Sequence, residues 1–166
     1  LILVFFLPPD YVGNLGQYLS AFLFALAGVT DWLDGYAARL WKAQSNIGRF
    51  LDPIADKLLV ATALILMVQS GRADLLPAIA IVCREILVSG LREYLAEIRV
   101  GVPVSKLAKF KTAAQMAAIF LLLLGSGAPH WMYAEISGRI LLWAAAILTL
   151  VTGYAYLKTG MKHMVE

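Results

Sequence analysis

The sequence predicts an all-α protein that crosses a membrane several times. Hydrophobic residues make up 61% of its 166 residues, and the mean hydropathy of +0.77 lies in the range of membrane proteins. Long apolar stretches recur along the chain, while charged residues gather between them or on single helical faces. We therefore expect one membrane domain over residues 1–166, built from six transmembrane helices.

The expected helices follow the apolar stretches in order. Residues 1–7 are apolar and stop at Pro8 and Pro9, which makes this segment too short to cross a bilayer alone. Because the chain also begins without Met, we expect the segment to be the tail of a first transmembrane helix whose beginning is missing. Further apolar stretches cover residues 15–30, 58–68, 75–88, 113–124 and 140–157. Several fall short of the roughly 20 residues that span a bilayer, but helical faces that carry charge inward can extend them.

Basic residues are divided unevenly between the two sets of helix ends. One set holds most of them: Arg39, Lys42, Arg49, Arg92, Arg99, Lys106, Lys109, Lys111, Lys158 and Lys162. The other set holds mainly Arg72 and Arg139. The positive-inside rule then places the connection around residues 42–46, the connection 99–111 and the C-terminus in the cytoplasm. A net charge of +3 suits an anionic lipid surface and anionic substrates, and no soluble basic face indicates nucleic-acid binding.

Four aspartates stand in this apolar chain as two pairs at helical spacing, Asp31 with Asp34 and Asp52 with Asp56. In a helix, the first two share one face with three further residues of the same segment, Gly35, Ala38 and Arg39. Gly48 shares a face of the next helix with the other two. Acidic groups are costly in apolar surroundings, and their presence there usually marks a functional site.

The two aspartate pairs lie at matching depths if the chain folds back at residues 42–46. The midpoint of Asp34 and Asp52 is residue 43, and that of Asp31 and Asp56 is 43.5. With about 1.5 Å of rise per residue, two antiparallel helices bring each pair to a similar level. Four carboxylates so placed repel one another unless a cation neutralises them or some are protonated. Ligands that are all oxygen favour a hard ion such as Mg²⁺ or Mn²⁺, whereas the alternative is a structural network with nearby Arg and Lys.

The segment from Asp31 to Asp56 resembles the complete signature of the CDP-alcohol phosphatidyltransferases, membrane enzymes that displace CMP from a CDP-linked lipid with an alcohol. Eight specified positions in the right order over 26 residues make this a specific pattern. Residues 84–93, REILVSGLRE, and 106–115, KLAKFKTAAQ, are also similar to stretches of the bacterial phosphatidylglycerophosphate synthases. That subfamily uses glycerol 3-phosphate as its acceptor.

The resemblance implies a role for each residue of the signature. Asp31, Asp34, Asp52 and Asp56 are expected to hold two divalent ions, Mg²⁺ or Mn²⁺, and Asp56 is expected to be the general base for the acceptor hydroxyl. Asp34, Gly35, Ala38 and Arg39 are assigned to the CDP-lipid. The alternative for Gly35 and Ala38 is close packing of helices by small residues. The resemblance further implies a homodimer in the bacterial inner membrane, with CDP-diacylglycerol and glycerol 3-phosphate as substrates.

Candidate acceptor residues lie further along the chain. Arg84 stands within an apolar stretch and Arg92 lies at i+8, so both can face one cavity. Arginine suits bidentate phosphate recognition, and Lys109 with Lys111 adds positive charge. The alternative is that Arg84 pairs with Glu85 or another acid, and that the lysines extend to lipid headgroups.

Two rival functions remain open from the sequence. Within the family, the acceptor could be inositol phosphate or serine. In another class, a divalent-cation transporter could use the aspartates as a midplane site, although no second acidic cluster or inverted repeat accompanies them. Cys83 is alone, so no disulfide or zinc site is expected, and we predict that it is a core residue.

Overall fold

The computed structural model describes residues 9–41, 46–98, 100, 106–125 and 133–165. All regular structure in this part of the chain is helical, which confirms the all-α prediction. The five helices are α2 (Pro9–Trp41), α3 (Asn46–Gln69), α4 (Leu75–Glu97), α5 (Lys106–Leu124) and α6 (Ala134–Val165). Each of the five apolar stretches after residue 8 lies in its own helix. The expected fragment at residues 1–7 lies outside the described residues.

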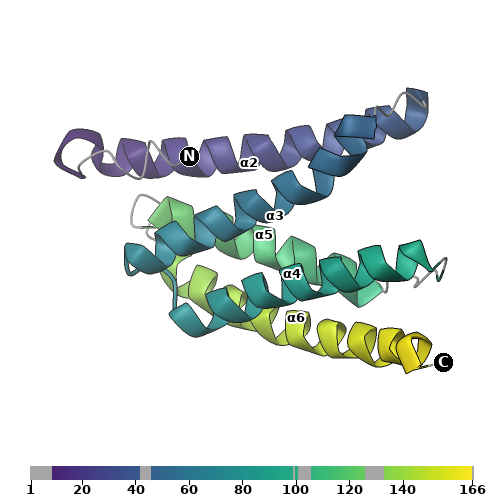
Figure 1. The fold of residues 1–166 in the computed structure, drawn as a ribbon. Coiled ribbons are helices and arrows are strands. Elements are labelled where there is room, and N and C mark those ends of the chain that lie inside the picture. The colour runs from purple at the N-terminus through teal and green to yellow at the C-terminus, as the bar shows by residue number, and fades with distance from the viewer. Residues whose placement is uncertain (1–8, 42–45, 99, 101–105, 126–132, 166) are drawn as a thin grey trace.

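The helices form a bundle in which α6 packs along both α5 and α4 (Figure 1). The contact between α5 and α6 is the most extensive, followed by that between α4 and α6. α2 packs on α5, and α3 joins α4. The core draws side chains from every helix, including Phe24, Leu64, Ile81, Leu122 and Leu142. The arrangement therefore brings α3, α4, α5 and α6 around a shared interior.

Close helix packing depends on small residues at the α5–α6 contact. A Cβ atom added to Gly138 of α6 would lie 2.8 Å from Cγ of Leu122 in α5. Real Cβ atoms are essentially never that close to a neighbour. Small residues allow helix backbones to approach in this way in membrane proteins. Gly138 therefore contributes to the position of α6 against α5.

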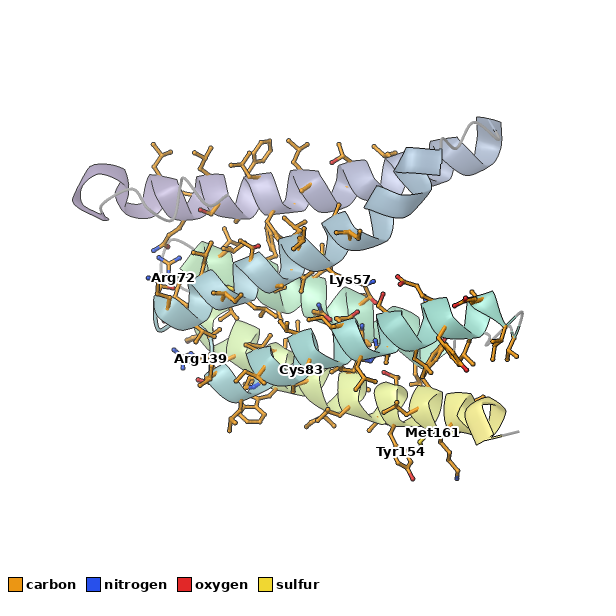
Figure 2. The ribbon with its side chains drawn as sticks, viewed as in Figure 1. Lys57, Arg72, Cys83, Arg139, Tyr154 and Met161 are labelled. Atoms are coloured by element: carbon orange, nitrogen blue, oxygen red, sulfur yellow. The ribbon has the colours of Figure 1, made fainter. Side chains whose placement is uncertain are left out.

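Large apolar side chains also cover the outside of the bundle. On α2, Leu15, Phe22 and Val29 are exposed, and on α6 Ile140 and Tyr154 are exposed. Figure 2 shows Tyr154 and Met161 projecting from α6 away from the other helices. Soluble proteins rarely expose apolar surface so continuously, whereas a lipid environment accepts it. The outer surface thus suits a membrane protein.

One helical segment among the described residues, Ala134–Met161, is long and apolar enough to cross a membrane by length and composition. Shorter apolar helical segments cover Leu15–Thr30, Lys57–Gln69 and Phe110–Leu124. α4 carries Arg84 and Arg92 among its apolar residues, which interrupts its apolar length. The six-span arrangement is therefore not established by the helices described.

The prediction that Cys83 belongs to the core is wrong, because the residue is exposed. α4 directs Ile81, Val88 and Leu91 into the bundle, and Cys83 falls on a different side of the helix. In a chain with so many apolar residues, hydrophobic character alone does not tell an interior position from a lipid-facing one.

Candidate active site

The signature residues lie at facing ends of two consecutive helices. α2 ends at Trp41 and α3 begins at Asn46, so the fold-back falls where the sequence predicts it. Asp31 and Asp34 belong to the last three turns of α2. Asp52 and Asp56 belong to the first three turns of α3. Both segments are therefore helical, as the shared helical faces predicted from the sequence require.

Most side chains of the signature lie outside those that the structure describes. This set comprises Asp31, Asp34, Gly35, Ala38, Arg39, Gly48, Asp52 and Asp56. Among the described side chains there is no group of three or more His, Cys, Asp or Glu residues that could hold a metal ion. The proposed metal ligands and the CDP-binding residues accordingly stay predictions. The fit to a metal rests on their donor chemistry, four carboxylates on two consecutive helices.

A cavity of about 200 Å³ opens beside the signature, between α3 and α4. Seven residues line it, Lys57, Arg84, Glu85, Val88, Ser89, Arg92 and Glu93, and five of them carry charged groups. The volume is several times the roughly 30 Å³ that one water molecule occupies in the liquid. The cavity therefore has room for a small polar molecule.

Lys57 connects this cavity to the signature. It directly follows Asp56 in α3, and its Nζ donates to the hydroxyl of Ser89 on α4. Figure 2 shows Lys57 where α3 approaches α4. Since consecutive Cα atoms are about 3.8 Å apart, the backbone at Asp56 lies next to the wall of the cavity.

Arg84 is nearly buried, with 9% of its side chain exposed, and three of its nitrogens have partners. Nε donates to the carbonyl oxygen of Thr149 at 3.1 Å, and Nη2 donates to Oγ1 of Thr152 at 3.0 Å. Nη1 donates to Oε1 of Glu85 at 3.4 Å. The guanidinium is thus fixed by α6 and by its neighbour on α4. The pairing with Glu85 that the sequence left open does occur.

Lys111 extends from α5 towards the same carboxylate. Its Nζ donates to Oε1 of Glu85, so Glu85 joins Arg84 and Lys111. Only 6% of the Lys111 side chain is exposed. Lys111 therefore lies inside the bundle and does not extend to the membrane surface, which overturns the headgroup alternative for this residue. The side chain of Lys109 lies outside the described residues.

Arg92 is the more exposed of the two arginines of α4. Its Nη2 donates to the hydroxyl of Tyr156 on α6 at 3.3 Å, and its Cζ lies 5.5 Å from the centroid of that ring. A guanidinium within about 6 Å of a ring centroid gains a cation–π attraction. The structure thus places Arg84 and Arg92 on one cavity wall, as the i+8 spacing predicts; their role as phosphate ligands stays a prediction.

Formal charge shows what the cavity can accept. Among the residues that line it, Lys57, Arg84 and Arg92 are cationic, and Glu85 and Glu93 are acidic. Three cations and two carboxylates leave an excess of one positive charge. Arginine and lysine side chains pair readily with phosphate, so the cavity suits a small anion such as a phosphate monoester.

Several residues of the cavity and its surroundings were not singled out from the sequence. Glu85 entered the sequence argument only as an ion-pair partner of Arg84, and Lys57 only as one of the basic residues near the aspartates. Those on α6, Thr149, Thr152, Gly153 and Tyr156, carry a signal that could have identified them. They fall at i, i+3, i+4 and i+7, which is a small or polar face on an otherwise apolar helix.

Comparison with known proteins shows the family of this chain. A family model described as CDP-alcohol phosphatidyltransferase matches residues 1–151. A Rickettsia felis protein named CDP-diacylglycerol–glycerol-3-phosphate 3-phosphatidyltransferase is 47% identical over 92% of this chain and 85% of its own length. Proteins of the same name from Haemophilus influenzae and Escherichia coli strain K12 are 40% and 39% identical, each over 99% of this chain and over 87% and 88% of their own lengths. The chain belongs to the CDP-alcohol phosphatidyltransferase family.

Proposed function

We propose that this protein transfers the phosphatidyl group of CDP-diacylglycerol to glycerol 3-phosphate, giving phosphatidylglycerol phosphate and CMP in phospholipid biosynthesis. The observation that carries the proposal is the extent of the likeness to proteins named for that reaction. Identity of 39% to 49% extends over 82% to 88% of the length of these relatives. The cavity chemistry supports the same acceptor, because its excess of cationic side chains suits a small phosphate.

Arg84 and Arg92, with support from Lys109 and Lys111, bind the acceptor phosphate. Arg92 is well placed for this contact, because it lines the cavity and is the more exposed of the two arginines. Glu85 holds Arg84 and Lys111 in place while no phosphate is bound. The neutral acceptor glycerol would leave the excess positive charge of the cavity unpaired, which disfavours it.

Asp31, Asp34, Asp52 and Asp56 hold two divalent ions, with Mg²⁺ or Mn²⁺ as the candidates. When bound, these ions neutralise charge on the pyrophosphate of CDP-diacylglycerol and on the departing CMP. Asp56 accepts the proton of the acceptor hydroxyl. Its neighbour Lys57 lines the acceptor cavity, which supports an acceptor hydroxyl close to Asp56. Asp34, Gly35, Ala38 and Arg39 bind the CDP moiety.

The protein is a multi-pass membrane enzyme with six spans and a site that faces the cytoplasm. The distribution of Arg and Lys supports this orientation. The exposed apolar faces of α2 and α6 support contact with lipid or with a second copy in a homodimer. Because the relatives named above come from bacteria, we infer that this protein lies in a bacterial inner membrane.

The test is CMP release by the purified protein with CDP-diacylglycerol and a panel of acceptors. We expect glycerol 3-phosphate to be preferred over glycerol, serine and inositol phosphate, and chelation by EDTA to abolish release until Mg²⁺ or Mn²⁺ is added. A preference for serine or inositol phosphate would move the protein to another branch of the family. Cation transport without CMP release would support the transporter alternative instead.

A further inference from the structure

A small and polar face of α6 holds both arginines of the cavity. Thr149, Thr152, Gly153 and Tyr156 define this α6 face, and all four are buried. The rest of the helix between Ile140 and Leu157 is almost entirely apolar. Burying hydroxyl groups in an apolar bundle costs free energy unless they find partners. Two of the hydroxyls have such a partner in an arginine of α4.

Arg84 is positioned by three features of the α6 face. The Thr149 carbonyl and the Thr152 hydroxyl each accept a hydrogen bond from its guanidinium. The side chain also crosses Gly153, where an added Cβ would lie 2.9 Å from Cγ of Arg84 and 3.3 Å from Nε. Because residue 153 is a glycine, the Arg84 side chain has room to pass and reach its two partners.

Arg92 is positioned two turns further along α4 by Tyr156. The phenol accepts a hydrogen bond from Nη2, and the ring lies under the guanidinium. Neither Thr152, Gly153 nor Tyr156 lines the cavity itself. Their contacts with the site run through the two arginines.

The comparisons differ in how far they extend into the α6 face. The match to the family model ends at residue 151, before three of its four residues. The relatives from Haemophilus influenzae and Escherichia coli align over 99% of the chain, so those alignments extend through the second half of α6.

We propose that the α6 face determines acceptor selectivity by fixing Arg84 and Arg92 in the geometry that a phosphate monoester requires. Thr149, Thr152, Gly153 and Tyr156 are positioning residues, because they act through the two arginines. The inference rests on the proposed function and extends it to a part of the chain without any signature residue. CDP-diacylglycerol recognition, which we assign to α2 and α3, is independent of this face.

The experiment measures KM for glycerol 3-phosphate and for CDP-diacylglycerol separately in Gly153→Ala and Thr152→Val. The first variant displaces Arg84, and the second removes a hydrogen-bond acceptor of a charged group, so each should raise KM for glycerol 3-phosphate by about tenfold. KM for CDP-diacylglycerol should stay within about twofold of the parent value. Tyr156→Phe keeps the ring under Arg92 and should give a smaller increase.

Two control variants on α6 match the chemistry of these changes. Gly138→Ala introduces an equally close contact, 2.8 Å to Leu122, far from either arginine. Thr159→Val removes an exposed hydroxyl that bonds within the helix, to the Ala155 carbonyl. Both controls should leave the two KM values unchanged, even if Gly138→Ala lowers thermal stability.

A double variant tests whether the effect runs through Arg84. In an Arg84→Ala background, Gly153→Ala should add nothing to KM for glycerol 3-phosphate, because the side chain that it displaces is gone. Additive effects, equal increases in both KM values, or the same increase in Gly138→Ala would overturn the proposal. If the parent releases CMP only with another acceptor, the proposed function fails and this inference fails with it. If the parent uses glycerol 3-phosphate and the variants have the parent's KM values, the proposed role of the α6 face is wrong and the proposed function still holds.

Discussion

Two ion-pair clusters in this bundle use the same functional groups in different surroundings. Where α4 and α6 begin, Arg139 donates to Asp74 at 3.0 Å and to the Gly71 carbonyl at 2.7 Å, and the indole of Trp143 donates to the same aspartate at 2.8 Å. Their side chains are 44% exposed for Arg139 and 39% for Asp74. Figure 2 shows Arg139 and Arg72 at that end of the bundle. This terminal cluster joins the α3–α4 turn to α6.

The cavity cluster of Arg84, Glu85 and Lys111 lies farther along the bundle. Its two cationic side chains are less than a tenth exposed, and Glu85 is 21% exposed. An exposed pair contributes about 0–1 kcal/mol, whereas a buried charge without its partner is costly. Both clusters contain an ion pair, but only the cavity cluster is buried. Burial beside a cavity is therefore the feature on which we base its proposed functional role. The same chemical substitution should therefore have a larger effect near the cavity than in the terminal cluster.

The largest difference is expected between two aspartates. Asp56→Asn removes the proposed general base and a metal ligand, so kcat should fall by about 10²- to 10⁴-fold while CDP-diacylglycerol still binds. Asp74→Asn makes the same chemical change in the terminal cluster and should leave kcat near the parent value. Steady-state CMP release measures both. Near-normal activity of Asp56→Asn would rule out the assigned base.

The next largest difference is expected between the arginines of the cavity and the arginine of the terminal cluster. Arg84→Ala or Arg92→Ala should lower kcat/KM for glycerol 3-phosphate by roughly 30-fold or more, because truncating a buried charged partner costs about 2–5 kcal/mol. Arg139→Ala should lower it little, since its guanidinium has no part in the cavity. Measuring KM for each substrate locates the loss. Loss of CDP-diacylglycerol affinity with retained glycerol 3-phosphate affinity would contradict the cavity assignment.

Stability should follow burial in the same way. Glu85→Gln leaves Arg84 and Lys111 without their carboxylate and should destabilise the protein by about 3–5 kcal/mol. Asp74→Asn breaks an exposed pair and should cost about 0–1 kcal/mol. Denaturation of the detergent-solubilised variants compares the two. Equal losses would show that burial does not distinguish the clusters.

Topology gives a qualitative contrast between the two ends of the bundle. The terminal cluster should face away from the cytoplasm, and the connection between α2 and α3 should face it. An impermeant thiol reagent applied to intact cells should label Gly127→Cys and leave Ser45→Cys unlabelled, in a Cys83→Ser background. Labelling of Ser45→Cys from outside would reverse the proposed orientation.

Much of the helix arrangement could be predicted from the sequence. The apolar stretches and the polar connection at residues 42–46 predicted the five described helices and the bend between α2 and α3. The i+8 spacing of Arg84 and Arg92 predicted a shared wall. These features repeat with the local period of a helix, so they can be read without knowledge of the fold.

Contacts between helices could not be read in that way. The alignment of Glu85 with Lys111 of α5, and of Arg84 with Thr149 of α6, depends on how helices far apart in sequence pack. The same limit explains the error at Cys83, since interior and lipid-facing positions are both apolar. Lys57 was missed as a residue of the cavity wall because its contact with Ser89 depends on the approach of α3 to α4.

Equilibrium binding of glycerol 3-phosphate to the purified protein tests the central claim most directly. The parent and Arg139→Ala should bind it with similar affinity, whereas Arg84→Ala and Arg92→Ala should bind it at least tenfold more weakly, since each loses a charge-assisted contact to phosphate. All four proteins should bind CDP-diacylglycerol alike in the presence of Mg²⁺. Equal binding of glycerol 3-phosphate by Arg92→Ala and the parent would show that the cavity between α3 and α4 is not the acceptor site.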